Sequence, residues 1–153
     1  MNPLVVSAYL ESKDLKNRKV KNKQLRVLAI DPSTDVLDLI KLSLEATTHW
    51  QLLLSSSAQE GSIKARRELP DLILLDFQMP QMNGIEMAMK LQSHPKTERI
   101  PLLLLTSLPH IISSQIFQEL GIAGVVRKPL NWFSLADLIV SSLEYSKKES
   151  YSY

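Results

Sequence analysis

The chain has 153 residues, 44% of them hydrophobic, and a formal net charge of +2, which suits one globular domain with tails. It contains no cysteine, so a disulfide framework and a thiolate metal site are both excluded. No apolar run is long enough to cross a membrane and the first ten residues do not resemble a secretory signal, so we expect a cytoplasmic protein.

The charge is distributed unevenly along the chain. Residues 11–24 hold six basic and two acidic side chains, a local charge of +4, which leaves −2 for the remainder. This segment lacks aromatic residues and glycine. Its lysines allow contact with nucleic acid or an anionic membrane, but its composition favours a solvated, flexible leader over residues 1–24.

After the leader, short apolar runs alternate with segments of helical periodicity. The predicted strands are about Leu25–Ile30, Trp50–Ser55, Asp71–Leu75, Ile100–Leu105 and Ile122–Val126. The predicted helices are about Ser33–Thr47, Ala58–Leu69, Ile85–Gln92, His110–Leu120 and Ser134–Tyr145. Strict alternation predicts an α/β fold with a doubly wound parallel sheet and helices on both faces, over residues 25–145. Residues 146–153 are predicted to form a polar tail.

Four polar side chains follow the predicted strands. Asp31, Asp76, Thr106 and Lys128 stand at the exits of the first, third, fourth and fifth strands. Singly, each has an ordinary explanation: Asp31 before Pro32 as a helix N-cap, Asp76 and Thr106 as caps, and Lys128 as a surface lysine. Parallel strands place all their carboxyl ends at one edge, where such folds bind ligands. Together these groups could bind Mg²⁺ and accept a phosphoryl group.

The motifs make this expectation specific. They are VLAID (27–31), AQEG (58–61), PDLILLDFQMPQMNG (70–84), IPLLLLTS (100–107) and GIAGVVRKP (121–129). In order and spacing they resemble the receiver domain of a two-component response regulator. The resemblance covers residues 25–145 and implies a flavodoxin-like, five-stranded parallel sheet of order 2-1-3-4-5. It also implies that the Lys128–Pro129 bond is often cis.

The resemblance assigns a role to each site residue. Asp76 matches the phosphoacceptor, Thr106 the switch hydroxyl, and Lys128 the lysine that pairs with the phosphorylated aspartate. Asp31, Asp76 and the main-chain carbonyl of Gln78 match the ligands of Mg²⁺. These are expectations carried over position by position.

The resemblance also implies partners. A histidine kinase or a phosphotransfer protein would donate the phosphoryl group, and an unidentified downstream protein would receive the signal. The sequence shows no helix-turn-helix pattern and little chain after the last helix, so we expect the protein to act by docking and not as an enzyme. A homodimer through the face formed by residues 110–120, 122–126 and 134–145 is one possibility.

Two positions depart from the family pattern. Receivers usually carry a second acid where this chain has Pro32, so we expect weaker Mg²⁺ binding and slower phosphotransfer. Receivers often carry an aromatic switch residue where this chain has Val125. Trp132 and Phe133 could supply an aromatic contact, although ordinary packing is the simpler interpretation.

Two further functions stay open at this point. The departures suggest a degenerate receiver that binds partners without being phosphorylated. A phosphatase of the haloacid dehalogenase type also uses an aspartate at a strand end. Such an enzyme needs a second acid where this chain has Gln78, which cannot donate a proton as an acid does.

Overall fold

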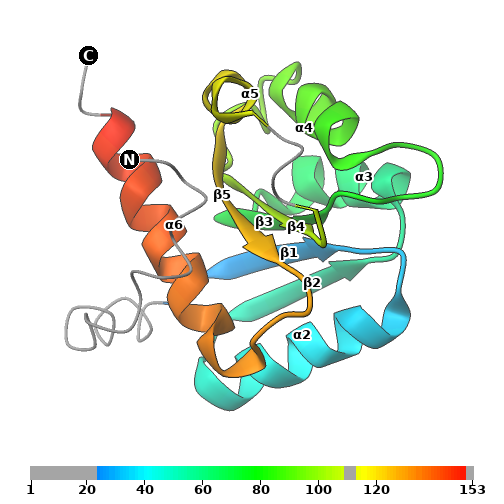
Figure 1. Ribbon diagram of the computed structural model, residues 1–153, viewed down its shortest axis with the longest axis vertical. Coiled ribbons are helices and arrows are strands. Elements are labelled where there is room, and N and C mark those ends of the chain that lie inside the picture. Colours follow the sequence, from blue (N-terminus) through cyan, green and yellow to red (C-terminus); the bar gives the residue numbers. More distant parts are fainter. Residues whose placement is uncertain (1–23, 109–112, 151–153) are drawn as a thin grey trace.

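The centre of the molecule is a five-stranded parallel sheet. The computed structural model describes residues 24–108 and 113–150, with side chains described to residue 146. Its strands are β1 (Arg26–Ile30), β2 (Gln51–Ser55), β3 (Leu72–Asp76), β4 (Leu102–Thr106) and β5 (Ile122–Arg127). They lie in the order β2-β1-β3-β4-β5 (Figure 1), which confirms the predicted topology.

Helices cover both faces of this sheet. They are α2 (Thr34–Thr47), α3 (Ala58–Glu68), α4 (Gly84–Gln92), α5 (Ser114–Glu119) and α6 (Leu135–Ser150), with a short 3-10 helix, η4 (Trp132–Ser134), before α6. One core cluster joins the sheet to α2 and α6, and the other joins it to α3, α4 and α5 (Figure 1). None of the helices in the described residues is long and apolar enough to cross a membrane.

The strands are buried because both faces are covered. All five residues of β3 are buried, and they alternate between the two clusters: Leu72 and Leu74 face α2 and α6, whereas Ile73 and Leu75 face the other helices. This alternation explains why the strands are near-continuous apolar runs in the sequence.

The element ends differ from the prediction at several places. β3 and β4 each extend one residue further, so Asp76 and Thr106 are the last residues of strands rather than the first residues of loops. The last helix continues to Ser150, past Tyr145, so residues 146–150, which were predicted to belong to a polar tail, are helical. The leader, over residues 1–23, and His110–Ile112 of the predicted fourth helix lie outside the described residues.

Side chains cap the helices that start at the carboxyl edge. The N-caps of α2, α3, α4 and α5 are Ser33, Ser57, Asn83 and Ser113, and each accepts a hydrogen bond from a backbone N–H in the first turn. Such a cap stabilises a helix by about 1 kcal/mol. The four caps fix where each helix leaves the sheet, and so fix the rim of the candidate site.

Candidate functional site

A carboxylate, a second carboxylate and an ammonium meet at the carboxyl edge. Asp31 directly follows β1, Asp76 ends the neighbouring β3, and Lys128 follows β5. The side chains of Asp31 and Asp76 are only 2% and 6% exposed. Lys128 Nζ lies 2.9 Å from Asp31 Oδ2 and 2.6 Å from Asp76 Oδ1, so one ammonium bridges both acids.

Asp31 is held by backbone groups on two sides. Its N–H donates to the carbonyl of Ser55 at 3.1 Å, and its Oδ1 accepts from the N–H of Ser33 at 2.8 Å. The interpretation of Asp31 as the N-cap of the first helix is therefore wrong, since Ser33 caps α2 and Pro32 lies before the cap. Capping of α2 by Ser33 leaves Asp31 Oδ2 directed at Lys128.

Asp76 is positioned by the loop that follows it. The N–H of Phe77 donates to the carbonyl of Leu105 at 2.8 Å, which extends the pairing of β3 with β4 beyond the acid. The N–H of Gly84 then returns to the carbonyl of Phe77, also at 2.8 Å. A Cβ at Gly84 would lie 2.9 Å from Phe77 Cα and 3.2 Å from the carbonyl oxygen of Asp76, so this close approach requires glycine.

Thr106 is buried at the end of β4, one position beyond the residue that pairs with Asp76. Within the described residues its hydroxyl accepts a hydrogen bond from the N–H of Leu108 at 3.1 Å, and no hydrogen bond joins it to Asp76. Its carbonyl accepts from the N–H of Lys128 at 2.9 Å. Thr106 does not cap α5, because Ser113 does. The structure therefore ties Thr106 to Lys128 through the backbone.

Burial and charge act in opposite directions on the two bridged groups. Burial raises the pKa of Asp76, helped by the nearby charge of Asp31 and opposed by the hydrogen bonds from Lys128 and from the N–H of Gln78. Burial by itself lowers the pKa of Lys128, but the hydrogen bonds to Asp76 and Asp31 outweigh it and raise that pKa. Lys128 is therefore a stable cation, and Asp76 is a carboxylate that takes up a proton more readily than an exposed aspartate.

The oxygen donors fit Mg²⁺ with a reduced set of protein ligands. The described residues contain no group of three or more histidine, cysteine, aspartate or glutamate side chains that could hold a metal. Asp31 and Asp76 supply two carboxylates, and Pro32 supplies no side-chain oxygen. Mg²⁺ is commonly held by one or two carboxylates and several waters, so the pair suits it. Both carboxylates also bind the Lys128 ammonium, and a metal would share them with that cation.

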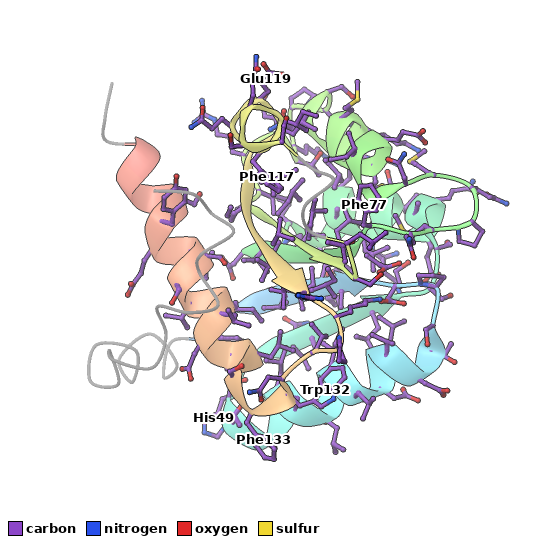
Figure 2. The ribbon with its side chains drawn as sticks, in the orientation of Figure 1. His49, Phe77, Phe117, Glu119, Trp132 and Phe133 are labelled. Carbon is purple, nitrogen blue, oxygen red and sulfur yellow. The ribbon has the colours of Figure 1, made fainter. Side chains whose placement is uncertain are left out.

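Val125 and the two predicted aromatic partners lie apart. Val125 is 7% exposed and belongs to the cluster on the α3, α4 and α5 face, with Phe117 of α5. Trp132 packs against the opposite cluster, and Phe133 is 92% exposed (Figure 2). The packing interpretation holds for Trp132, and neither aromatic substitutes for a ring at Val125. Phe117 was missed in the sequence, although it follows Ile116 within the periodic helix.

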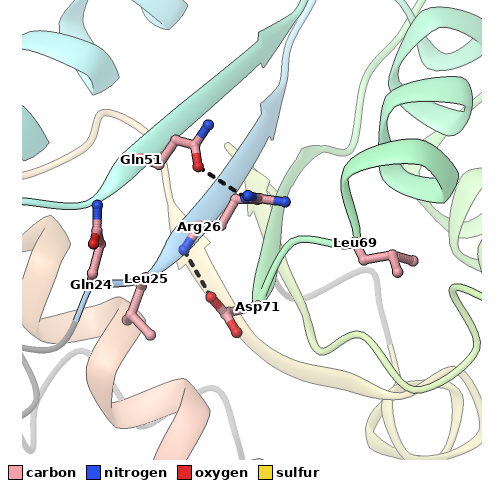
Figure 3. A pocket seen from close by; sticks show the side chains of 6 residues that line it. All are labelled: Gln24, Leu25, Arg26, Gln51, Leu69 and Asp71. Atoms are coloured by element: carbon pink, nitrogen blue, oxygen red, sulfur yellow. Dashed lines mark hydrogen bonds between the residues drawn. The ribbon is translucent and has the colours of Figure 1, made fainter.

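A cavity lies at the opposite, amino-terminal edge of the strands. It has a volume of about 420 Å³ and is lined by Gln24, Leu25, Arg26, Gln51, Leu69 and Asp71 (Figure 3). Arg26 Nε donates to Gln51 Oε1 at 3.0 Å, and the N–H of Arg26 donates to Asp71 Oδ2 at 2.8 Å. These contacts tie the starts of the strands together. The cavity is remote from Asp76, and none of the predicted site residues lines it.

Comparison with protein families places this geometry among known proteins. The profile of the response regulator receiver domain matches residues 27–140. The response regulator PleD of Caulobacter vibrioides is 34% identical over 106 residues, which is 69% of this chain and 23% of PleD. A 14.6 kDa protein of Leptolyngbya boryana is 28% identical over 76% of this chain and 88% of its own length. The chain thus spans a small part of PleD and most of the second relative.

Solved structures agree with the sheet order. A CheY-like response regulator receiver domain protein from Methanospirillum hungatei aligns with a TM-score of 0.71 at 27% identity. The alignment covers 83% of this chain and 99% of that protein. In addition, the Lys128–Pro129 peptide bond is cis, as the sequence motif implied.

Proposed function

Since this chain belongs to the response regulator receiver domain family, we propose that it is a phosphoacceptor in two-component signalling, with Asp76 as the acceptor. Receiver domains generally act as signalling modules rather than as enzymes. The observation that carries the proposal is the buried Asp76 carboxylate at the end of β3, with the Lys128 ammonium 2.6 Å away. The donor would be a phosphohistidine on a histidine kinase or a phosphotransfer protein.

The transfer step follows from the chemistry of the two groups. A carboxylate oxygen of Asp76 attacks phosphorus while the phosphorus–nitrogen bond to the donor imidazole breaks, and the electron pair returns to the imidazole nitrogen. A new oxygen–phosphorus bond to Asp76 thus replaces the phosphorus–nitrogen bond of the donor. Lys128 stays protonated and contacts the new phosphoryl oxygens. When bound through Asp31, Asp76 and the carbonyl of Gln78, Mg²⁺ would neutralise charge on the transferred group. Because Pro32 replaces an acid, we propose weaker Mg²⁺ binding than in typical receivers.

The response would begin at Thr106. Its hydroxyl accepts from the N–H of Leu108 and keeps its own proton to donate to a phosphoryl oxygen, toward which the hydroxyl would move. Such a movement reorganises the loop after β4 and shifts the domain between two packings. We propose that this changes docking of a downstream protein, or of a second copy, on the face formed by α5, β5 and α6.

The second candidate is a degenerate receiver that binds partners without phosphorylation. One feature of the pocket favours it: the Lys128 ammonium already pairs with both Asp31 and Asp76, and Pro32 removes an oxygen donor. With its acids already paired to the Lys128 ammonium, the domain needs neither a metal nor a phosphoryl group to stay in one conformation. The phosphatase alternative has no such support, because Gln78 stands where that chemistry needs a proton donor.

Intact-mass measurement after incubation with acetyl phosphate and Mg²⁺ separates these functions. We expect the mass of one phosphoryl group on the wild type and on Asp38→Asn, a control that changes an exposed aspartate of α2. Asp76→Asn should gain none. If the wild type also gains none, the degenerate receiver replaces the proposal. Steady turnover of a phosphate ester that requires Asp76 would instead support the phosphatase.

A further inference from the structure

An exposed apolar stripe runs along α2. Leu39 and Leu42 are 43% and 66% exposed, and Ala46 is also exposed. Their spacing of three and four residues puts them on one side of the helix. The opposite side of α2 buries Leu37, Ile40 and Leu44 in the core. Large aliphatic side chains along an outer helix face are a feature of interaction surfaces.

The segment after the candidate site extends this stripe. The hydroxyl of Ser43, next to Leu42 in the sequence, donates to the carbonyl of Trp132 and fixes η4 against α2. The next residue, Phe133, is 92% exposed (Figure 2). Leu39, Leu42, Ala46 and Phe133 together are called the α2–η4 surface below.

Acidic side chains border this surface. Asp35, Asp38 and Glu45 are exposed on α2, whose one basic residue is Lys41, so the helix carries a net charge of −2. By helical geometry Asp35 lies within the apolar stripe, and Asp38 and Glu45 lie on its flank away from Ser43. An apolar surface with an acidic border suits a partner that combines aliphatic side chains with lysines.

The chain itself contains such a segment. Residues 11–24 carry a local charge of +4, and the apolar residues Leu4, Val5, Val6, Tyr9 and Leu10 precede them. The leader enters the domain near the end of α2, because the N–H of Gln51, four residues after Thr47, donates to the carbonyl of Leu25 at 2.7 Å. Residues 11–23 separate the apolar part of the leader from the domain, and thirteen residues in an extended chain can reach about 40 Å. The 14 residues of α2 span about 21 Å. The leader is therefore long enough.

We propose that the leader docks on the α2–η4 surface of its own chain. The apolar residues between Leu4 and Leu10 cover Leu39, Leu42 and Phe133, and the lysines of residues 13–23 pair with the acids of α2. A tethered segment docks at a high effective concentration, so individually weak contacts suffice. This interaction is separate from the phosphoryl chemistry and does not require Asp76.

A spin label on the full chain tests the proposal. Because the protein has no cysteine, Ser7→Cys provides a single attachment point. We expect a label at position 7 to broaden the NMR signals of Leu39, Leu42 and Phe133 strongly. A label at Lys96→Cys, in an exposed loop after α4, should leave them sharp. Sharp signals with the label at position 7, or broadening confined to other surfaces, would overturn the proposal.

Two further measurements identify the occupant. In the first, spin-labelled chain without isotope enrichment is mixed with isotope-enriched chain that carries no spin label. The NMR signals of the α2–η4 surface should then stay sharp. Broadening in that mixture means that a second copy occupies the surface, which contradicts intramolecular docking. The double change Leu42→Ser and Phe133→Ser should abolish the effect of the label at position 7. The matched control Met89→Ser removes a side chain that is 57% exposed on α4 and should preserve it. The same broadening is expected when the experiment is repeated in the Asp76→Asn variant, because docking of the leader does not require phosphorylation of Asp76.

Discussion

Lys128→Met is the most informative change because one ammonium pairs with two buried acids. Lys128 Nζ lies 2.9 Å from Asp31 and 2.6 Å from Asp76, and the two acids are 2% and 6% exposed. Methionine keeps most of the apolar stem of the side chain but removes the terminal ammonium and its charge. The variant would then hold two neighbouring carboxylates with no cation.

The size of the effect follows from the burial of the three groups. Removing one partner of a buried ion pair costs about 3–5 kcal/mol. The Lys128 side chain is 26% exposed, so water offsets part of the loss and we expect about 3 kcal/mol. For a chain of this length that lowers Tm by on the order of 10 °C. The acids can escape the penalty by binding a proton, so the loss should shrink as pH falls.

Urea unfolding at pH 7.5 and at pH 5, without divalent cations, measures this effect. Lys90→Met, at an exposed position on α4, is the matched control and should change the free energy of unfolding by less than about 0.5 kcal/mol. A loss below 1 kcal/mol for Lys128→Met at pH 7.5, or a loss that grows as pH falls, would refute the reasoning. Addition of Mg²⁺ should restore more stability to the variant than to the wild type, because the metal then meets no competing ammonium.

Three more changes probe the same pocket. Because burial raises the pKa of Asp76, the charged carboxylate opposes folding, and Asp76→Asn should raise Tm at neutral pH. This gain in Tm should disappear as pH falls through the raised pKa, because the wild-type acid then becomes protonated. Pro32→Asp restores an oxygen donor and should tighten Mg²⁺ binding on the order of tenfold, or about 1.4 kcal/mol, by titration calorimetry; unchanged affinity would contradict the role given to Pro32. Gly84→Ala puts a Cβ 2.9 Å from Phe77 Cα and should cost about 1–3 kcal/mol in urea unfolding, whereas an unchanged midpoint would mean that the loop after Asp76 yields freely.

The sheet was predictable because its strands are short and buried on both faces. Runs such as Leu72–Leu75 cannot be amphipathic helices, and their alternation with periodic segments requires parallel pairing. The convergence of Asp31, Asp76 and Lys128 follows from the same topology, since parallel strands end at one edge. The order of the strands and helices along the chain therefore predicts that these residues lie close together.

The contacts among these residues were not predictable from spacing. Asp31 and Ser33 can both cap a helix; in the structure Ser33 caps α2, and its backbone N–H binds Asp31 Oδ1. The bridging position of Lys128 depends on how far its side chain reaches from the end of β5, past β4, to the ends of β3 and β1, which no local pattern encodes. Phe117 could have been recognised as a core residue, but its place beside the cluster of Val125 depends on how α5 packs.

The position of Val125 leaves the backbone as the connection between the two sides of the pocket. The N–H of Lys128 donates to the carbonyl of Thr106, and the N–H of Leu108 donates to the hydroxyl of the same threonine. Lys128 also bridges Asp31 and Asp76, so any group that draws its ammonium away from those acids acts on the ends of β4 and β5 together. A typical receiver could relay this change through an aromatic ring, and a valine in that cluster cannot rotate into a new site. We therefore expect the end of β4, rather than position 125, to carry the change between the packings of this domain.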